Sequence, residues 1–173
     1  MPTPLLETKL FVPRPRRGLV ARPRLSGRLD RGGASKLMLV SAPAGFGKTT
    51  LLAEWLAAGP AAPTSGRSAA WLSLDKGDND PASFWTYVIA ALQTVAPGVG
   101  ASALTLLQEP QPLPIPTVLT TLLNDLGAIA SDLVLVLDDY HVIDARDVQD
   151  GMEFLLDHLP PQLHLVIASR ADP

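Results

Sequence analysis

Residues 36–50 read KLMLVSAPAGFGKTT, and two patterns meet within this segment. Its first part, Lys36–Ser41, is an apolar run that predicts a strand buried on both faces. The part that follows is rich in small residues and leads into apolar residues at helical spacing, which stop at Gly59-Pro60. The segment therefore predicts a buried strand, a glycine-containing turn and a helix over Thr49–Ala58.

The turn has the residue types that bind the phosphates of a nucleotide. Gly45 and Gly47 let successive backbone N–H groups approach a β-phosphate closely, and the positive end of the following helix faces the same anion. Lys48 is placed to reach the β- and γ-phosphates, and Thr49 to offer its hydroxyl to Mg²⁺. We expect the whole cradle to consist of Ala44, Gly45, Phe46, Gly47, Lys48, Thr49 and Thr50. Ala42 replaces the first glycine of the strict pattern, a small departure.

A second motif supplies carboxylates for the same site. The apolar run Leu133–Leu137 predicts a buried strand, and it ends in Asp138-Asp139. Ligands bind at the carboxyl ends of strands in open α/β sheets, so we expect Asp138 to serve Mg²⁺. Asp139 is a candidate to orient or deprotonate an attacking water, although capping of the strand end would also explain it. Arg170 follows another apolar strand and is a candidate γ-phosphate contact or a plain surface charge.

Strands and helices alternate along the rest of the chain. Further strands are predicted at Ala69–Leu74 and Leu163–Ala168, and the residues between Pro97 and Pro116 are expected to be irregular. Further helices are predicted at 80–95, 117–129 and 148–159. This alternation predicts an α/β fold, a P-loop NTPase-type parallel sheet of four strands with helices on both faces. We divide the chain into a basic N-terminal arm (residues 1–33), mostly extended with a short helical turn at Leu25–Leu29, and the NTPase domain (residues 34–173).

Composition and charge limit the possible functions. The chain has 173 residues, 47% of them hydrophobic and 18% charged, and no cysteine, which favours one globular, cytoplasmic domain without disulfides or thiolate metal sites. Eight of its 14 Lys and Arg residues lie within residues 1–31, together with two of its 17 acidic residues. The arm could contact nucleic acid, pack on the acidic body or face bound phosphates. The carboxylates Asp75, Asp78 and Asp80 lack the spacing of a calcium loop and are better explained as helix caps and turns.

Several motifs in order resemble one protein family over nearly the whole chain. They are Leu6–Leu10, Pro13–Arg16, Leu19–Leu25, Ser41–Thr50, Ala70–Asp75, Asp78–Pro81, Leu137–His141 and His164–Arg170. Together they resemble the N-terminal nucleotide-binding region of the large ATP-dependent LuxR-family transcriptional regulators of the maltose-activator type. These regulators belong to the signal-transduction ATPases with numerous domains (STAND).

The resemblance implies a switch that holds ADP at rest, binds ATP and self-associates when induced, and is reset by hydrolysis. It implies that the N-terminal arm contributes to the adenine site, where Val20 and Arg22 help to hold the adenine, and that Arg170 contacts the γ-phosphate. It also implies a five-stranded sheet in which the strand before Arg170 lies between the loop strand and the magnesium strand. Because the sequence stops at Pro173, we expect the fifth strand and all DNA-binding modules to be missing, and no direct DNA binding from this segment.

Three functions remain open at this point. The first is an ATP/Mg²⁺-binding switch module with slow or absent hydrolysis on its own, in which Lys48, Asp139 and Arg170 would be the catalytic residues. The second is a small P-loop kinase or stand-alone NTPase, which the absence of an arginine-rich lid disfavours. The third is a nucleic-acid-binding module that uses the basic arm, which lacks interleaved aromatic residues after Phe11.

Overall fold

The computed structural model describes residues 4–14, 22–58 and 67–170. Within these residues four parallel strands form one sheet in the order β1-β4-β3-β2. They are β1 (Leu37–Ser41), β2 (Ser68–Ser73), β3 (Leu133–Asp138) and β4 (Leu163–Ser169). The predicted α/β fold of P-loop NTPase type is confirmed, and β4 lies between the loop strand β1 and the acidic strand β3, as the family resemblance implied.

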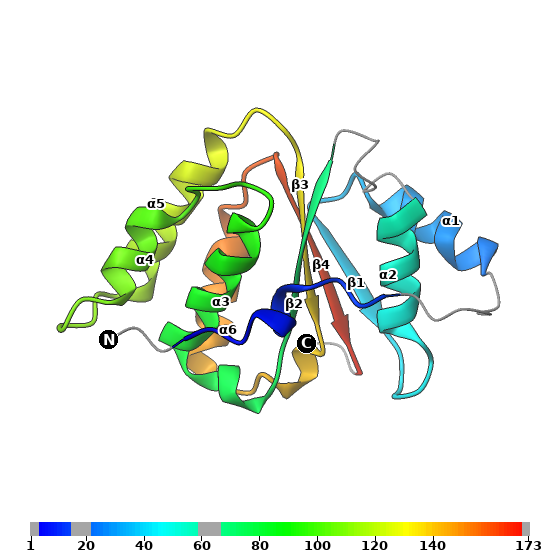
Figure 1. Cartoon of the computed structure of the whole chain (residues 1–173), viewed down its shortest axis with the longest axis horizontal. Helices are drawn as coiled ribbons and strands as arrows, with labels where there is room; N and C mark the ends of the chain where they lie inside the picture. Colours follow the sequence, from blue (N-terminus) through cyan, green and yellow to red (C-terminus); the bar gives the residue numbers. More distant parts are fainter. Residues whose placement is uncertain (1–3, 15–21, 59–66, 171–173) are drawn as a thin grey trace.

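Helices cover both faces of the sheet (Figure 1). One face carries α1 (Pro23–Gly32) and α2 (Lys48–Ala58), and the other carries α3 (Pro81–Gln93), α4 (Ala101–Leu107), α5 (Ile115–Gly127) and α6 (Arg146–Asp157). Short 3-10 helices are η1 (Glu7–Leu10), η3 (Lys76–Asn79) and η4 (Tyr140–Val142). η1 packs against β2 and α3, so the N-terminal segment crosses the far edge of the sheet from β1.

The alternation of side chains along the central strands creates two cores. In β3, Leu135 and Leu137 face the layer of α3 to α6, whereas Val134 and Val136 face α1 and α2. Trp71 of β2 belongs to the smaller core with α2. In the described part of the chain, no helix combines the length and apolar character needed to cross a bilayer.

The prediction that the loop strand is buried on both faces is wrong for β1. Leu37 and Leu39 are 36% and 48% exposed, while every residue of β3 and β4 is buried. The reason is topological: β1 is an edge strand, and the apolar pattern of a strand does not say how many neighbours it has. Among the described residues β1 pairs with β4 alone.

Two expectations about irregular segments also need correction. The arm is not mostly extended where it is described, because residues 23–32 form the full helix α1, with Pro23 in its first turn, where proline is well tolerated. The proline-rich stretch after Pro97 contains α4, whose Ala103 is fully buried. That helix begins after Gly100, whose N–H donates to the Asp125 carboxylate of α5, so tertiary packing outweighs the weak local pattern.

Candidate nucleotide-binding site

The turn between β1 and α2 has the backbone that a phosphate cradle requires. Gly45 and Gly47 both have positive φ, 85° and 73°, the left-handed region that favours glycine. A Cβ on Gly45 would meet no atom within 4 Å, so the requirement there is conformational. α2 is 11 residues long and begins at Lys48, so its first N–H groups lie at the end of this turn. The predicted strand–turn–helix arrangement is confirmed.

The side chain of Lys48 bonds to the backbone at the start of the turn. Its Nζ donates to the carbonyl oxygens of Ala42 at 2.5 Å and Pro43 at 3.2 Å. These bonds hold the ammonium group beside the turn, where it offsets the negative ends of the two carbonyl dipoles. A phosphate oxygen offers a stronger, charge-assisted acceptor than either carbonyl, so an anion in the cradle would attract the same ammonium group.

Thr49 and Asp138 meet, although 89 positions separate them in the sequence. Thr49 Oγ1 donates to Asp138 Oδ2 at 2.6 Å, and the N–H of Asp139 donates to Asp138 Oδ1 at 3.0 Å. Each carboxylate oxygen of Asp138 therefore has a donor that fixes its orientation. A hydroxyl and a carboxylate side by side are hard oxygen ligands of the kind that Mg²⁺ takes in proteins, so these residues fit the predicted ion.

Ionisation of the Asp138 carboxyl group is unfavourable in this position. Burial raises its pKa above the usual 3.8, and the neighbouring Asp139 carboxylate adds to the effect. The hydrogen bonds from Thr49 and from the Asp139 N–H, and the charge of Lys48, oppose this shift without cancelling it. An added cation at this point would favour the ionised form.

Asp139 has a special backbone. Among the described non-glycine residues, Asp139 alone has a positive φ, 59°. It immediately precedes η4. Apart from glycine, aspartate and asparagine adopt this conformation most readily, because their short polar side chains can hydrogen-bond locally. Asp139 is half-buried beside Asp138 at the end of β3, which is where a water-orienting carboxylate was predicted.

Of the predicted adenine contacts, Val20 lies outside the described residues and Arg22 is described. Arg22 Nη1 donates to the carbonyl oxygen of Phe46 at 2.9 Å, and its guanidinium would lie 3.3 Å from a Cβ on Gly47. Arg22 therefore braces the phosphate turn from outside. Arg170 is exposed directly after β4, whose Ser169 is in register with Ser41 of β1, so it lies at the same edge of the sheet as the turn.

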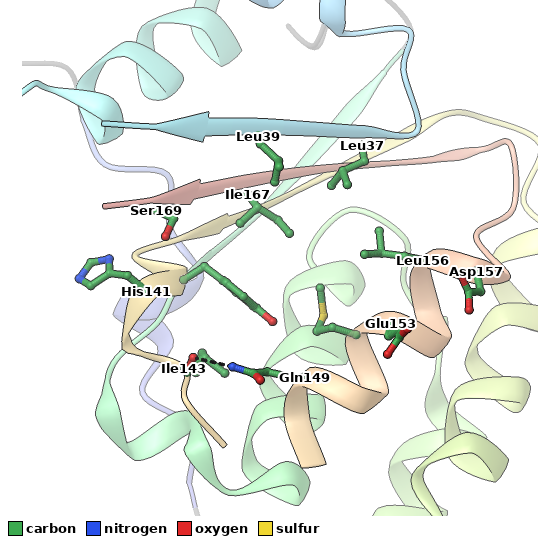
Figure 2. Close-up of a pocket in the computed structure, with 12 residues that line it drawn as sticks. Leu37, Leu39, His141, Ile143, Gln149, Glu153, Leu156, Asp157, Ile167 and Ser169 are labelled. Atoms are coloured by element: carbon green, nitrogen blue, oxygen red, sulfur yellow. Dashed lines mark hydrogen bonds between the residues drawn. The ribbon is translucent and has the colours of Figure 1, made fainter. Parts of the chain in front are cut away.

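A groove of about 570 Å³ runs along the other side of β1, away from the phosphate turn. Figure 2 shows Leu37, Leu39 and Ile167 of the sheet on one side of it and Leu156 of α6 on the other. His141 and Ser169 line its end near the carboxyl ends of the strands. The groove is a consequence of the edge position of β1, and its mixed lining includes the carboxylates of Glu153 and Asp157, which disfavour phosphate groups.

Sequence reasoning missed a polar network on the neighbouring turn. Lys9 is buried and forms ion pairs with Asp78 at 2.5 Å and Asp75 at 3.2 Å, and its Nζ lies 4.2 Å from the centre of the Tyr87 ring. Asn79 bridges this turn to the segment after η4. The prediction that these carboxylates cap helices and turns is confirmed. The signal in the sequence for these ion pairs was Lys9, a lysine followed directly by apolar residues.

Comparison with known proteins identifies relatives of this chain. No family model matches it. The HTH-type transcriptional regulator MalT of Cronobacter sakazakii is 38% identical over 98% of this chain and 18% of the relative, and MalT of Vibrio cholerae is 32% identical over 97% and 18%. The chain thus spans less than a fifth of the length of these curated relatives.

Solved structures show weaker likeness. A chain in the structure of Drosophila ORC bound to AT-rich DNA and Cdc6 is 12% identical, covering 86% of this chain and 44% of that one, with a TM-score of 0.47. Caenorhabditis elegans PCH-2 is 13% identical, covering 87% and 34%, with a TM-score of 0.43. At these scores the likeness adds no argument about function. The sequence relatives decide the assignment: the chain is a homologue of one segment of the MalT-type, LuxR-family transcriptional regulators.

Proposed function

We propose that this chain is the ATP- and Mg²⁺-binding switch module of a MalT-type transcriptional regulator. The observation that carries the proposal is the meeting of Thr49 and Asp138 at 2.6 Å, directly beside the glycine turn and Lys48. Three separate requirements of a nucleotide site coincide here: backbone N–H groups for phosphates, a cation for the β- and γ-phosphates, and oxygen ligands for Mg²⁺.

In this proposal each residue has a limited task. Residues 44–50 surround the phosphates, and Lys48 exchanges its carbonyl partners for phosphate oxygens. Thr49 and Asp138 would hold Mg²⁺ with their hydroxyl and carboxylate oxygens. Mg²⁺ supplies positive charge that offsets the phosphate charges.

Asp139 and Arg170 give the module its sensitivity to the γ-phosphate. Asp139 would orient a water at the end of β3, and Arg170 would approach from the end of β4, so ATP and ADP would be distinguished at the carboxyl edge of the sheet. We propose slow or absent hydrolysis by the chain alone. In the longer relatives, self-association and transcriptional control would follow from this choice between ATP and ADP.

The basic arm supports this function better than nucleic-acid binding. Lys9 forms ion pairs with Asp75 and Asp78, and Arg22 donates a hydrogen bond to the phosphate turn. Two of the arm's cations therefore bond to the protein itself, Lys9 to carboxylates of the acidic body and Arg22 to the Phe46 carbonyl of the phosphate turn.

Calorimetric titration with ATP and with ADP, in Mg²⁺ and in EDTA, tests the proposal. Lys48→Ala should weaken ATP binding by roughly tenfold or more, because one charge-assisted phosphate contact is lost. Lys36→Ala is the matched control: Lys36 precedes the same strand at its opposite end, and the described hydrogen bond of its side chain is a long one, 3.5 Å to the Leu159 carbonyl. Absence of ATP binding by the unaltered chain at millimolar nucleotide would refute the proposal, as would equal binding by the Lys48 variant.

A further inference from the structure

We propose that Asn79 is a positioning residue for the magnesium-binding carboxylate of Asp138, acting through the η4 turn. This inference rests on the function proposed above and adds a residue to it. Asn79 ends η3, the turn that follows β2, and β2 lies beside β3 in the sheet. The two strands end together, so the turn after one strand contacts the segment after the other.

The side chain of Asn79 ties these two segments together with three hydrogen bonds. Its Nδ2 donates to the Val142 carbonyl at 2.9 Å, and its Oδ1 accepts from the N–H groups of Asp144 at 2.8 Å and Ala145 at 2.9 Å. The amide carries its donor and its acceptor on two separate atoms, so it can bond a carbonyl oxygen and two N–H groups at once. An ionised carboxylate has no donor for the carbonyl oxygen. Asn79 therefore fixes the chain on leaving η4.

The η4 turn in turn fixes Asp139. The N–H of Val142 donates to the Asp139 carbonyl at 3.1 Å, and Asp139 is in the left-handed conformation, with φ at 59°. Aspartate tolerates this conformation, and the bond from Val142 to its carbonyl holds the turn that follows. The N–H of Asp139 donates to Asp138 Oδ1 at 3.0 Å, while Thr49 donates to the other oxygen of that carboxylate. Without Asn79 the turn can relax, and the bond from Asp139 to Asp138 weakens.

Asn79 can act as a fixed point because its own turn is rigid. Asp78 is 1% exposed, and its Oδ2 accepts from Lys9 Nζ at 2.5 Å and from the Asp75 N–H at 2.8 Å. Asp75 accepts from the Gly77 N–H in the same capping box. These bonds hold the turn that ends in Asn79.

The experiment measures how much Mg²⁺ tightens ATP binding, from calorimetric titrations in Mg²⁺ and in EDTA. Asn79→Ala should lower the affinity for ATP in Mg²⁺ by less than the roughly tenfold or more seen when a direct outer-shell partner of a metal ligand is removed, because Asn79 acts through the η4 turn, with less than about a twofold change in EDTA. The matched control is Asp80→Ala, at the adjacent position. Asp80 caps α3 through the Ser83 N–H, so its loss should lower the melting temperature and leave the Mg²⁺ effect unchanged.

A second variant guards against misfolding of the first. Ala145→Pro removes one of the N–H groups that Asn79 accepts, and the φ of −66° at Ala145 suits proline. It should reduce the Mg²⁺ effect in the same direction and by less. A normal Mg²⁺ effect in both variants, or an equal loss in Asp80→Ala, overturns the inference.

The unaltered chain separates this inference from the function on which it rests. If it binds ATP equally well in Mg²⁺ and in EDTA, nucleotide binding stands and the role of Asn79 at a metal site falls. If it binds no ATP in either condition, the proposed function itself fails.

Discussion

Replacing Lys9 by methionine removes the ammonium group that neutralises Asp78 and keeps a side chain of similar length. Lys9 joins the N-terminal segment to the turn after β2, since its Nζ contacts Asp78 at 2.5 Å and Asp75 at 3.2 Å. The two partners differ in environment: the side chain of Asp78 is 1% exposed and that of Asp75 is 60% exposed. The loss should therefore fall almost entirely on the Asp78 contact.

The magnitude follows from this burial. Leaving one member of a buried ion pair without its partner costs about 3–5 kcal/mol. The lower end applies here, because Asp78 keeps the hydrogen bond from the Asp75 N–H at 2.8 Å. The exposed contact with Asp75 adds little. We therefore expect Lys9→Met to lower the free energy of unfolding by about 3 kcal/mol, or roughly 6–12 °C in melting temperature for a chain of this size.

Urea denaturation followed by tryptophan fluorescence measures this change, since Trp55, Trp71 and Trp85 are all buried. Asp78→Asn and the double variant complete a cycle. If the charge pair is the origin of the effect, the double variant should be more stable than the summed losses predict, by about 2 kcal/mol. Lys76→Met, at an exposed lysine on the same turn, should change stability by less than about 0.5 kcal/mol. A loss below about 1 kcal/mol for Lys9→Met, or additive losses in the cycle, would refute this reasoning.

Three further substitutions test other parts of the structure. Burial raises the pKa of Asp138, so the folded chain keeps this proton to higher pH than the unfolded chain, and stability should fall as pH rises from about 3.8 through the folded pKa. Asp138→Asn should abolish that fall and make the ligand-free chain more stable at neutral pH, which melting curves across this pH range will show or contradict. Gly100→Ala should cost roughly 3 kcal/mol, because its φ is 72° and the new Cβ would lie 2.7 Å from Ile89 Cγ2. Gly98→Ala has a similar φ, 87°, and open space, so denaturation should show a loss of only about 1 kcal/mol, and equal losses for the two would exclude the steric explanation.

The sequence was sufficient for the parts of the site that are encoded locally. A phosphate turn consists of consecutive residues, so the strand, the turn with positive φ at Gly45 and Gly47, and the helix from Lys48 could be predicted, while the binding roles of these residues stay predictions. Asp138 could be paired with Thr49 because carboxyl ends of parallel strands meet at one edge, whatever their separation in the sequence. The same logic predicted the edge at which Arg170 lies.

What escaped prediction depends on which elements become neighbours. Leu39 has the same apolar character as Leu135, yet one lies on an edge strand and the other in the centre of the sheet. The partners of Asn79 lie 63 to 66 positions further along the chain, in a turn whose backbone N–H groups are invisible in a sequence. The sequence Asn79-Asp80-Pro81 therefore indicates only a helix start. The hydrogen bonds of Asn79 to the segment after β3 cannot be read from it.

The burial of Asp138 connects stability with ligand binding. An ionised carboxylate at 3% exposure is unfavourable in the ligand-free chain, even with donors on both oxygens. A divalent cation beside it would lower its pKa and stabilise the ionised form in the folded state alone. Mg²⁺ together with nucleotide should consequently raise the melting temperature of the unaltered chain by more than nucleotide alone, and Asp138→Asn should lose this extra rise while gaining stability without ligand. If both chains gained equally from Mg²⁺, the ion would have to bind elsewhere, and the magnesium role of Asp138 would be rejected.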